Sequence, residues 1–419
     1  MPFNIKTFVK NKLTAHPKIY STISDLNFRL FRILGVIFFK NIDSSSDIET
    51  IGSSGFESFK GYYDVSPENS DGLIFVYETQ DSTIREPHHY EYITICIYDS
   101  SDLRRPIRSR STQAFNWQQG SRAYWIDNRR LVYNDYCEKT DAYVAKVWDV
   151  LDDVIERSFQ FAVESQIDDI RYISISFKRL AVMRPDYGYF AHSKSSELAF
   201  DDDNDGLWIV NTGSGESLLK YSISDIIRSS SLKFPEGTQH KLNHALVSPD
   251  KKRSLLVHRY YINGIRRSRL LVVQLDTEHI IEIPAGESIC HYCWLSNDLA
   301  IGYLMNLEGI LGYYYIYIGS QELRSVHDIS GLPAVDGHPV NIGELKFVTD
   351  SYPDKWGRQK LYQLDDNRNI KVIGSFLHGI KYMGESRCDL HPAFSHDSGY
   401  LYFDSVYSGK RRAYRLRLS

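Results

Sequence analysis

The stretch His244-Ala-Leu-Val-Ser-Pro-Asp250 decides the fold, because the same pattern returns three more times along the chain. Each copy starts with a histidine, continues through about four residues to a turn of the Ser-Pro-Asp kind, and leads into a second strand. The other copies begin at His291, His338 and His391, so the histidines follow one another at 47, 47 and 53 residues. These separations are close to the ~40 to 50 residues of one four-stranded propeller blade. The period therefore predicts blades.

Three weaker copies precede these four, at Tyr63, at Phe115 and at Tyr172. Together the copies predict an all-β chain, a seven-bladed β-propeller with a short N-terminal helical extension. We expect residues 1–50 to form the helical and basic extension and residues 51–419 the propeller. Because blades bury their faces against one another, no further domain boundary is expected. The longer spacing from Tyr172 to His244 predicts an insertion between them.

Composition excludes several classes of protein. The chain is 42% hydrophobic and 24% charged, and its 30 Tyr and 20 Phe favour strands. Its net charge of −4 gives no broad positive surface for nucleic acid. The glycine patterns of phosphate-binding loops are missing, so no nucleotide cofactor is expected. The Gly-x-Ser-x-Gly motif of α/β serine hydrolases is missing too.

Cysteine usage and the N-terminal sequence bear on location. The five cysteines are odd in number, which favours free thiols in a reducing compartment, and we expect a cytoplasmic protein. The apolar run from Ile33 to Phe39 has basic neighbours and is too short to span a bilayer. One interpretation is a helix packed on the propeller. The other is an amphipathic segment that brings residues 1–45 to a membrane surface.

The four repeat histidines, His244, His291, His338 and His391, should lie at the same depth around the central channel. A single histidine at this position can simply bond to the backbone of a neighbouring blade. Four in register favour a shared function instead. Imidazole transfers protons near neutral pH and is a common metal ligand, so the ring suits proton transfer or metal binding.

Further polar residues occur where strands end near the channel. Arginine binds a carboxylate through two hydrogen bonds, and Tyr or His can move a proton, so these residues are candidate ligands for an acidic sugar. They include Arg184 and Arg259 and four candidate substrate-binding residues, His258, Asp350, Tyr352 and Arg358. Arg184 can equally hold a loop by pairing with Asp186, and the segment from Asp350 can be only a turn.

A resemblance to a known family rests on a few of these motifs. The segment from Asn243 to Asp250 with His258-Arg259, followed by His291, His338-Pro339 and Asp389-Leu-His-Pro392, resembles the propeller polysaccharide lyases. The oligogalacturonate lyases are the more similar group and the ulvan lyases the looser one, and the repeat pattern covers most of residues 55 to 419. The resemblance implies β-elimination next to a uronic acid, with an acidic glycan as substrate.

The resemblance also implies roles. His244 would be the base, Arg184 and Arg259 the clamp for the carboxylate, and Tyr187 or Tyr189 the acid. His291, His338 and His391 would bind a divalent metal, manganese or zinc, or the carboxylate. The chain departs from the oligogalacturonate lyases in one place, because they carry a Gln and two His as ligands within one blade, and this segment has only Asp389 and His391.

Two other metal sites are alternatives. Cys290, His291 and Cys293, with Cys388 from another blade, are suitable zinc ligands, unless the thiols are simply part of the core. The acidic run Asp201-Asp-Asp-Asn-Asp205 suits calcium, but it lacks the remaining spacing of a calcium loop, and an exposed acidic turn explains it as well.

The function we expect is a lyase acting on an acidic polysaccharide or oligosaccharide in the channel mouth. The alternative is a non-catalytic propeller that binds a glycan or a protein partner in surface-polysaccharide assembly. Convergence of His244 and the arginines on one pocket would favour the lyase.

Overall fold

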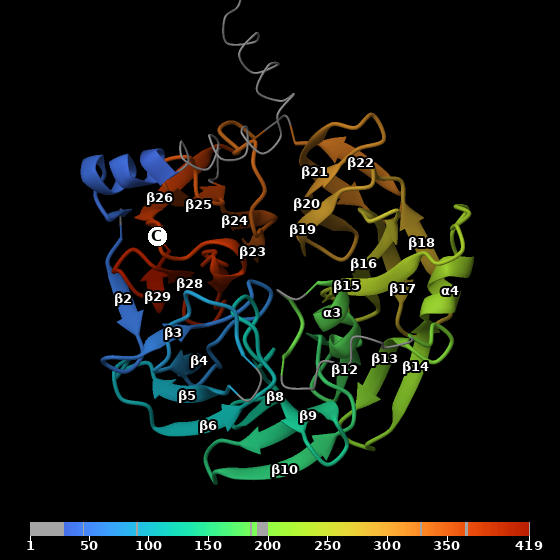
Figure 1. Ribbon diagram of the computed structural model, residues 1–419, viewed down its shortest axis with the longest axis horizontal. Helices are drawn as coiled ribbons and strands as arrows, with labels where there is room; N and C mark the ends of the chain where they lie inside the picture. The colour runs from blue at the N-terminus through green and yellow to red at the C-terminus, as the bar shows by residue number, and fades with distance from the viewer. Residues whose placement is uncertain are drawn as a thin grey trace, which may run out of the picture.

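The computed structural model describes residues 29–44, 46–88, 91–184, 187–190, 200–326, 329–364 and 368–418. Within these residues the strands form seven sheets around one central axis (Figure 1). Residues 29–38 form a helix at the rim of the disc. The prediction of an all-β, seven-bladed propeller with a short N-terminal helix is therefore confirmed. No helix in the described part of the chain is long and apolar enough to cross a bilayer.

The first four blades follow one another along the chain, each with its innermost strand first. Blade 1 has β3 (Glu57–Phe59), β4 (Leu73–Thr79), β5 (Ile93–Asp99) and β6 (Arg108–Thr112). Blade 2 has β7 (Tyr124–Trp125), β8 (Arg130–Cys137), β9 (Ala142–Asp149) and β10 (Val154–Phe159). Blade 3 has β11 (Ser165–Gln166), β12 (Arg171–Ser174), β13 (Gly206–Asn211) and β14 (Ser217–Ser222). Blade 4 has β15 (Gln239–Val247), β16 (Arg253–Ile262), β17 (Ile265–Gln274) and β18 (Ile280–Ile283).

Blade 5 also follows the order of the chain, whereas blades 6 and 7 each add an N-terminal strand to C-terminal strands. Blade 5 has β19 (Ile289–Trp294), β20 (Leu299–Met305), β21 (Leu311–Tyr317) and β22 (Glu322–Ser325). Blade 6 has β23 (Val340–Gly343), β24 (Lys346–Asp350), β25 (Arg358–Leu364), β26 (Ile370–Leu377) and the N-terminal β1 (Ile42–Ser44). Blade 7 has β27 (Ala393–Phe394), β28 (Tyr400–Ser405), β29 (Arg412–Arg417) and the N-terminal β2 (Ile48–Ile51).

Strands β1 and β2 close the ring. Ile42 of β1 pairs with Phe376, and Ile48 of β2 pairs with Leu416. Each N-terminal strand covers the outer edge of a C-terminal blade, and pairing removes the open hydrogen-bonding groups of that edge. The division into residues 1–50 and 51–419 stays a prediction.

The core lies between neighbouring blades. One cluster joins Phe59 and Tyr77 of blade 1 to Leu131 and Trp148 of blade 2. Similar clusters join blades 4 and 5, blades 6 and 7, and blade 7 to blade 1. Burying one large apolar side chain contributes about 1.5–3 kcal/mol, so these faces stabilise the ring as a whole.

Two inner strands differ from the prediction. Tyr172 lies in β12, the second strand of blade 3, and the inner strand is β11. In blade 2 the inner strand is β7, which comes after the segment at Phe115. Strands β7 and β11 have two residues each, too few to show an alternating pattern.

The longer spacing before His244 does contain inserted structure. Helix α3 (Phe177–Met183) lies between β12 and β13, and α4 (Ile223–Arg228) lies between β14 and β15. Side-chain caps start both helices, because Ser176 accepts a hydrogen bond from the backbone of Arg179 and Ser222 accepts one from Asp225. A short 3-10 helix, η2 (Gly384–Ser386), precedes β27. Helix α3 lies near the channel (Figure 1).

Candidate active site

The four repeat histidines lie together in the channel around the ring of Tyr62. The centroid of this ring is 5.6 Å from His244, 6.5 Å from His291, 6.2 Å from His338 and 5.0 Å from His391. All four histidines are at least nine-tenths buried. The prediction that they converge is confirmed, whereas their chemical roles stay predictions.

A local backbone distortion accompanies three of these histidines, His244, His291 and His391. The pairing of β15 with β16 shifts at His244 and Ala245, and His291 lies in a corresponding shift of β19. His244 has a φ of 51°, His391 of 44° and Arg122, at the same place in blade 2, of 54°. Bulges re-aim side chains, and a positive φ in a residue with a side chain persists only where its surroundings hold it. At each of these positions the distorted backbone therefore directs one side chain into the channel.

His244 is a neutral imidazole with one nitrogen unused. Its Nδ1 lies 3.2 Å from the hydroxyl of Tyr62, and its Nε2 is buried without a hydrogen-bond partner among the described residues. Burial, together with the positive charge of Arg259 and neighbouring cations, lowers the pKa of His244 well below its ordinary value. The ring is therefore uncharged at neutral pH, and burial makes it a weak base.

Three other predicted catalytic residues join His244. The ring of Tyr187 lies 5.2 Å from the His244 ring, and the guanidinium of Arg184 lies 4.4 Å from the Tyr187 ring. Arg259 is buried, and its hydrogen bond goes to the carbonyl of Ile289 at 3.3 Å. Burial and the charge of Arg184 lower the pKa of Arg259 to about 10. Asp186, the alternative partner of Arg184, lies outside the described residues.

Tyr189 does not share this position. Its ring stacks on Phe177 at 4.3 Å within a hydrophobic cluster, and its hydroxyl accepts a hydrogen bond from Asn134. It faces the core because it follows α3, whose Phe177 packs on the same cluster.

Two of the four candidate substrate-binding residues lie elsewhere. His258 is buried between His240, at 3.0 Å, and Arg269, at 3.2 Å, in the middle of blade 4. Arg358 pairs with Asp354 and lies over the ring of Phe39, beside the N-terminal helix. The expectation that these two reach the channel is wrong. His258 precedes Arg259 on a strand, and successive side chains point to opposite faces.

The other two, Asp350 and Tyr352, do border the histidine ring. The carboxylate of Asp350 accepts hydrogen bonds from His338 Nδ1 at 2.9 Å and from the backbone of His338 and His391. Burial alone would lower the pKa of His338, but the charge of Asp350 raises it. Tyr352 lies 5.8 Å from the His338 ring and under the guanidinium of Arg387. Asp350 is therefore fully buried and holds His338 and His391 in position.

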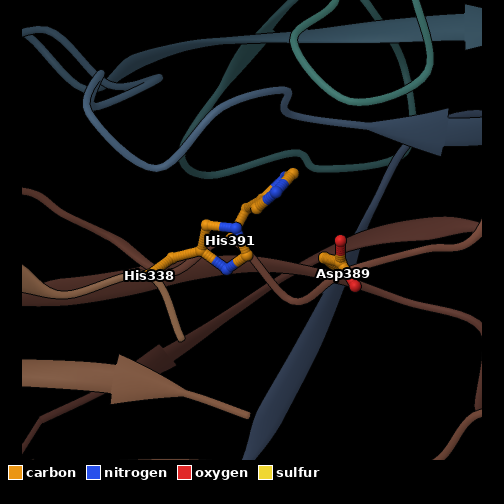
Figure 2. A group of neighbouring side chains, drawn as sticks. All are labelled: His338, Asp389 and His391. Carbon is orange, nitrogen blue, oxygen red and sulfur yellow. The ribbon is translucent and has the colours of Figure 1, made fainter. Parts of the chain in front are cut away.

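His338, His391 and Asp389 form a group that could hold a metal ion. Figure 2 shows the two imidazoles next to one another with the Asp389 carboxylate to one side. One ligand atom from each residue lies within 4.8 Å of the others. His291 is not in this group, because its Nδ1 lies 3.1 Å from the carboxylate of Asp336.

The donors fit a divalent cation. The Nε2 atoms of His338 and His391 are buried and lack hydrogen-bond partners in the described structure. Asp350 holds the other nitrogen of His338, as carboxylates commonly do for metal-binding histidines. One contact competes, since Arg387 donates two hydrogen bonds of 2.7 Å to Asp389. A bound cation would therefore share this carboxylate with an arginine.

The alternative zinc and calcium sites are not assembled in the part of the chain that the structure describes. Cys293 lies in the cluster with Phe347, and Cys388 packs in another. In the acidic run, Asp202 and Asp205 pair with the buried Arg179, at 2.8 and 2.7 Å. The run is thus a turn held by an ion pair.

Several channel residues were missing from the sequence prediction. Arg122 donates two hydrogen bonds of 2.8 Å to Asp64 and lies 3.9 Å from Glu164. These three residues lie in loops of, or next to, blades 1 to 3. Arg122 lies four residues before the turn that starts at Ile126. His244 lies at the same distance from the turn that starts at Ser248. Counting back from the turns would have found Arg122. Tyr62 has no such signal, because it lies in a long excursion between β3 and β4.

A cavity of about 310 Å³ reaches this second group from one side of the channel. Its lining includes Asp64, Arg122 and Glu164, with Trp125 and Gln166 nearer the rim. Burial raises the pKa of Glu164 to about 7 although Arg122 opposes the shift. The cavity is lined by inner residues of blades 1 to 4.

Comparison with known proteins identifies no family for this chain. No family model matches the chain, and no curated protein matches its sequence. Among solved structures, the β-propeller domain of the Trilobed protease from Pyrococcus furiosus is 13% identical, with a TM-score of 0.45 over 85% of this chain and 94% of that one. An oligogalacturonate lyase in complex with manganese is 10% identical, with a TM-score of 0.41 over 91% and 95%.

An oligogalacturonate lyase from Vibrio parahaemolyticus is also 10% identical, with a TM-score of 0.39 over 91% of this chain and 99% of that one. Propellers host many unrelated functions. These likenesses concern the propeller fold, and any function must be argued from the site.

Proposed function

We propose that this propeller is a lyase that cleaves an acidic polysaccharide or oligosaccharide next to a uronic acid by β-elimination. The observation that carries the proposal is a neutral histidine, His244, beside the buried cation Arg259. Arg259 has no carboxylate partner among the described residues, and a second cation, Arg184, depresses its pKa. A buried unpaired guanidinium is costly, and an anionic ligand would relieve that cost.

Each chemical demand of the reaction has a group that can meet it. The proton at C5 of a uronate becomes acidic only when its neighbouring carboxylate is neutralised. Arg259 and Arg184 supply the positive charge for that carboxylate. His244 Nε2 takes the C5 proton, and the 3.2 Å contact between Nδ1 and the hydroxyl of Tyr62 holds the ring in one orientation.

The electrons of the C5–H bond then form the C4–C5 double bond, and the bond from C4 to the glycosidic oxygen breaks. The departing oxygen takes a proton from an acid, for which Tyr187 is the better placed of the two predicted tyrosines, because its ring contacts His244. A divalent cation, manganese or zinc, held by His338, His391 and Asp389 would add positive charge beside the developing negative charge.

The test is the ultraviolet absorbance of the unsaturated uronate during incubation with a panel of uronate-containing polysaccharides. We expect a rise with the parent enzyme and a loss of about 10²–10⁴-fold in rate for His244→Ala. His279→Ala is the matched control, because His279 is exposed on blade 4. A control variant as slow as His244→Ala, or no product from any substrate, would contradict the proposal.

A second candidate function is a non-catalytic propeller that binds a glycan or protein partner in surface-polysaccharide assembly. One observation favours it: His291 and His338 already have carboxylate partners, Asp336 and Asp350. Histidines satisfied in this way can serve the blade structure alone. In that case His244→Ala would leave glycan binding unchanged, and isothermal titration with the same polysaccharides separates the two functions.

A further inference from the structure

The helix of residues 29–38 packs on blade 6 through one narrow face. The rings of Phe31 and Phe39 contact the ring of Trp356, with centroids 4.8 and 5.9 Å away. Gly35 lies so close that a Cβ there would be 1.9 Å from the carbonyl oxygen of Trp356. Only glycine allows this approach, so the side of the helix that faces the protein is well defined.

The exposed part of this helix is mostly apolar. Its side chains are about half to three-quarters exposed: Leu30, Ile33, Val36, Ile37 and Phe38. Surface helices normally place polar residues there. Other exposed apolar residues of the described chain, such as Leu307 and Ile265, are scattered over other blades. A contiguous cluster, unlike scattered residues, marks a binding surface.

The cluster continues onto the propeller itself. A groove of about 420 Å³ runs between the helix residues Ile33, Val36 and Ile37 and the loop from His378 to Tyr382. In that loop Ile380 is 45% exposed, and Met383 just after it is 42% exposed. We call this surface, made of the five helix side chains with Ile380 and Met383, the rim patch. It joins two segments that are far apart in sequence.

Exposed cations border the rim patch. Arg29 and Lys40 lie at the two ends of the helix, Lys381 lies in the loop, and Lys355 lies beside Trp356. The sequence is biased in the same way, because residues 1–40 contain seven Lys or Arg and one Asp, whereas the whole chain has a net charge of −4. Along the chain, the acidic residues nearest to the helix are Asp25 before it and Asp43 after it.

We propose that the rim patch docks this protein onto the surface of a membrane that contains anionic lipids. Apolar side chains would enter the interface between headgroups and acyl chains, and the cations would pair with lipid phosphates. This arrangement anchors the protein without a spanning helix. It does not depend on the proposed lyase activity.

The experiment compares two double variants of the full chain with the same change in charge. Ile37→Glu with Phe38→Glu places two acids in the rim patch. Ile265→Glu with Leu307→Glu places two acids at equally exposed apolar positions on blades 4 and 5. Co-sedimentation is measured with vesicles of phosphatidylcholine alone and of phosphatidylcholine mixed with phosphatidylglycerol.

We expect the parent to bind the anionic vesicles at least about tenfold more tightly than the neutral ones, since each basic residue contributes about 1 kcal/mol. The rim-patch variant should lose at least about tenfold of that binding, and the control variant should stay within about twofold. Hydrogen exchange of residues 29–40 and 379–383 should slow only with anionic vesicles.

Two results would overturn the proposal. One is a parent that does not bind anionic vesicles, or two double variants that bind equally. The other is a parent that self-associates through the rim patch and loses this association in Ile37→Glu with Phe38→Glu, because a second copy of the chain would then be its partner.

Discussion

The channel wall of blades 4 to 7 differs from that of blades 1 to 3. Blades 4 to 7 place histidines there, at 244, 291, 338 and 391, and leave three of their Nε2 atoms without partners among the described residues. Blades 1 to 3 place Arg122 and Glu164 near Asp64, and these groups form a buried ion-pair cluster. One half therefore keeps groups available for chemistry, and the other half holds the ring together.

The largest effect on stability should come from the half with the ion pairs. Arg122→Met leaves the buried Asp64 carboxylate unpaired and should lower the free energy of unfolding by about 3–5 kcal/mol, measured by urea denaturation. Arg253→Met is the control, because its partners Asp250 and Asp298 are partly exposed and the loss should be about 0–1 kcal/mol. Equal losses of unfolding free energy in the two variants would mean that the buried ion pair of Arg122 stabilises the ring no more than an exposed one.

Metal binding tests whether the four histidines of blades 4 to 7 have different roles. His391→Ala removes a proposed ligand and should weaken binding of manganese or zinc by at least about tenfold in isothermal titration. His291→Ala removes a histidine engaged with Asp336 and should change the affinity by about twofold or less. If both variants bind metal equally well, the group at His338, Asp389 and His391 is not the site.

Glu164 should make the free energy of unfolding depend on pH. Folding raises its pKa from about 4.5 to about 7, so the folded state holds a proton that the unfolded state releases, and stability falls as pH rises through that window. Glu164→Gln lacks this penalty and should gain up to roughly 3 kcal/mol over the parent between about pH 4.5 and about pH 8. Urea unfolding at both pH values measures the gain. Glu156→Gln, on an exposed strand, should show no such change.

The smallest effect concerns the contact that joins the two halves. Tyr62 comes from blade 1, and its hydroxyl bonds to His244 of blade 4 across the channel. A double-mutant cycle of Tyr62→Phe and His244→Ala should give a coupling energy of about 0.5–1.5 kcal/mol. A coupling near zero would mean that this hydrogen bond does not orient His244.

The sequence predicted the channel residues of blades 4 to 7 well and those of blades 1 to 3 poorly. Blades 4 to 7 have a histidine and a turn at fixed spacing, so blade number and channel position could both be read. Blades 1 to 3 have short inner strands, β7 and β11, and different side chains at the channel. Only the spacing of Arg122 to its turn carried a signal.

The limits of the site prediction have a similar cause. Arg184 and Tyr187, which follow α3, converge with His244 of β15 and Arg259 of β16, as expected. The prediction failed for His258, since adjacent strand residues face opposite sides of a sheet. Contacts such as Asp336 with His291 join different blades or loops, and no local pattern encodes them.

The way the ring closes has a consequence during synthesis. Strands β1 and β2 leave the ribosome first, but their partners β26 and β29 come near the end of the chain. At roughly 5–20 residues per second, both strands wait on the order of tens of seconds with unpaired edges. Throughout that time the neighbouring apolar helix has no blade 6 to pack on. Unpaired edges can pair with other strands during that time, and a chain cut short before β29 leaves β2 without its partner.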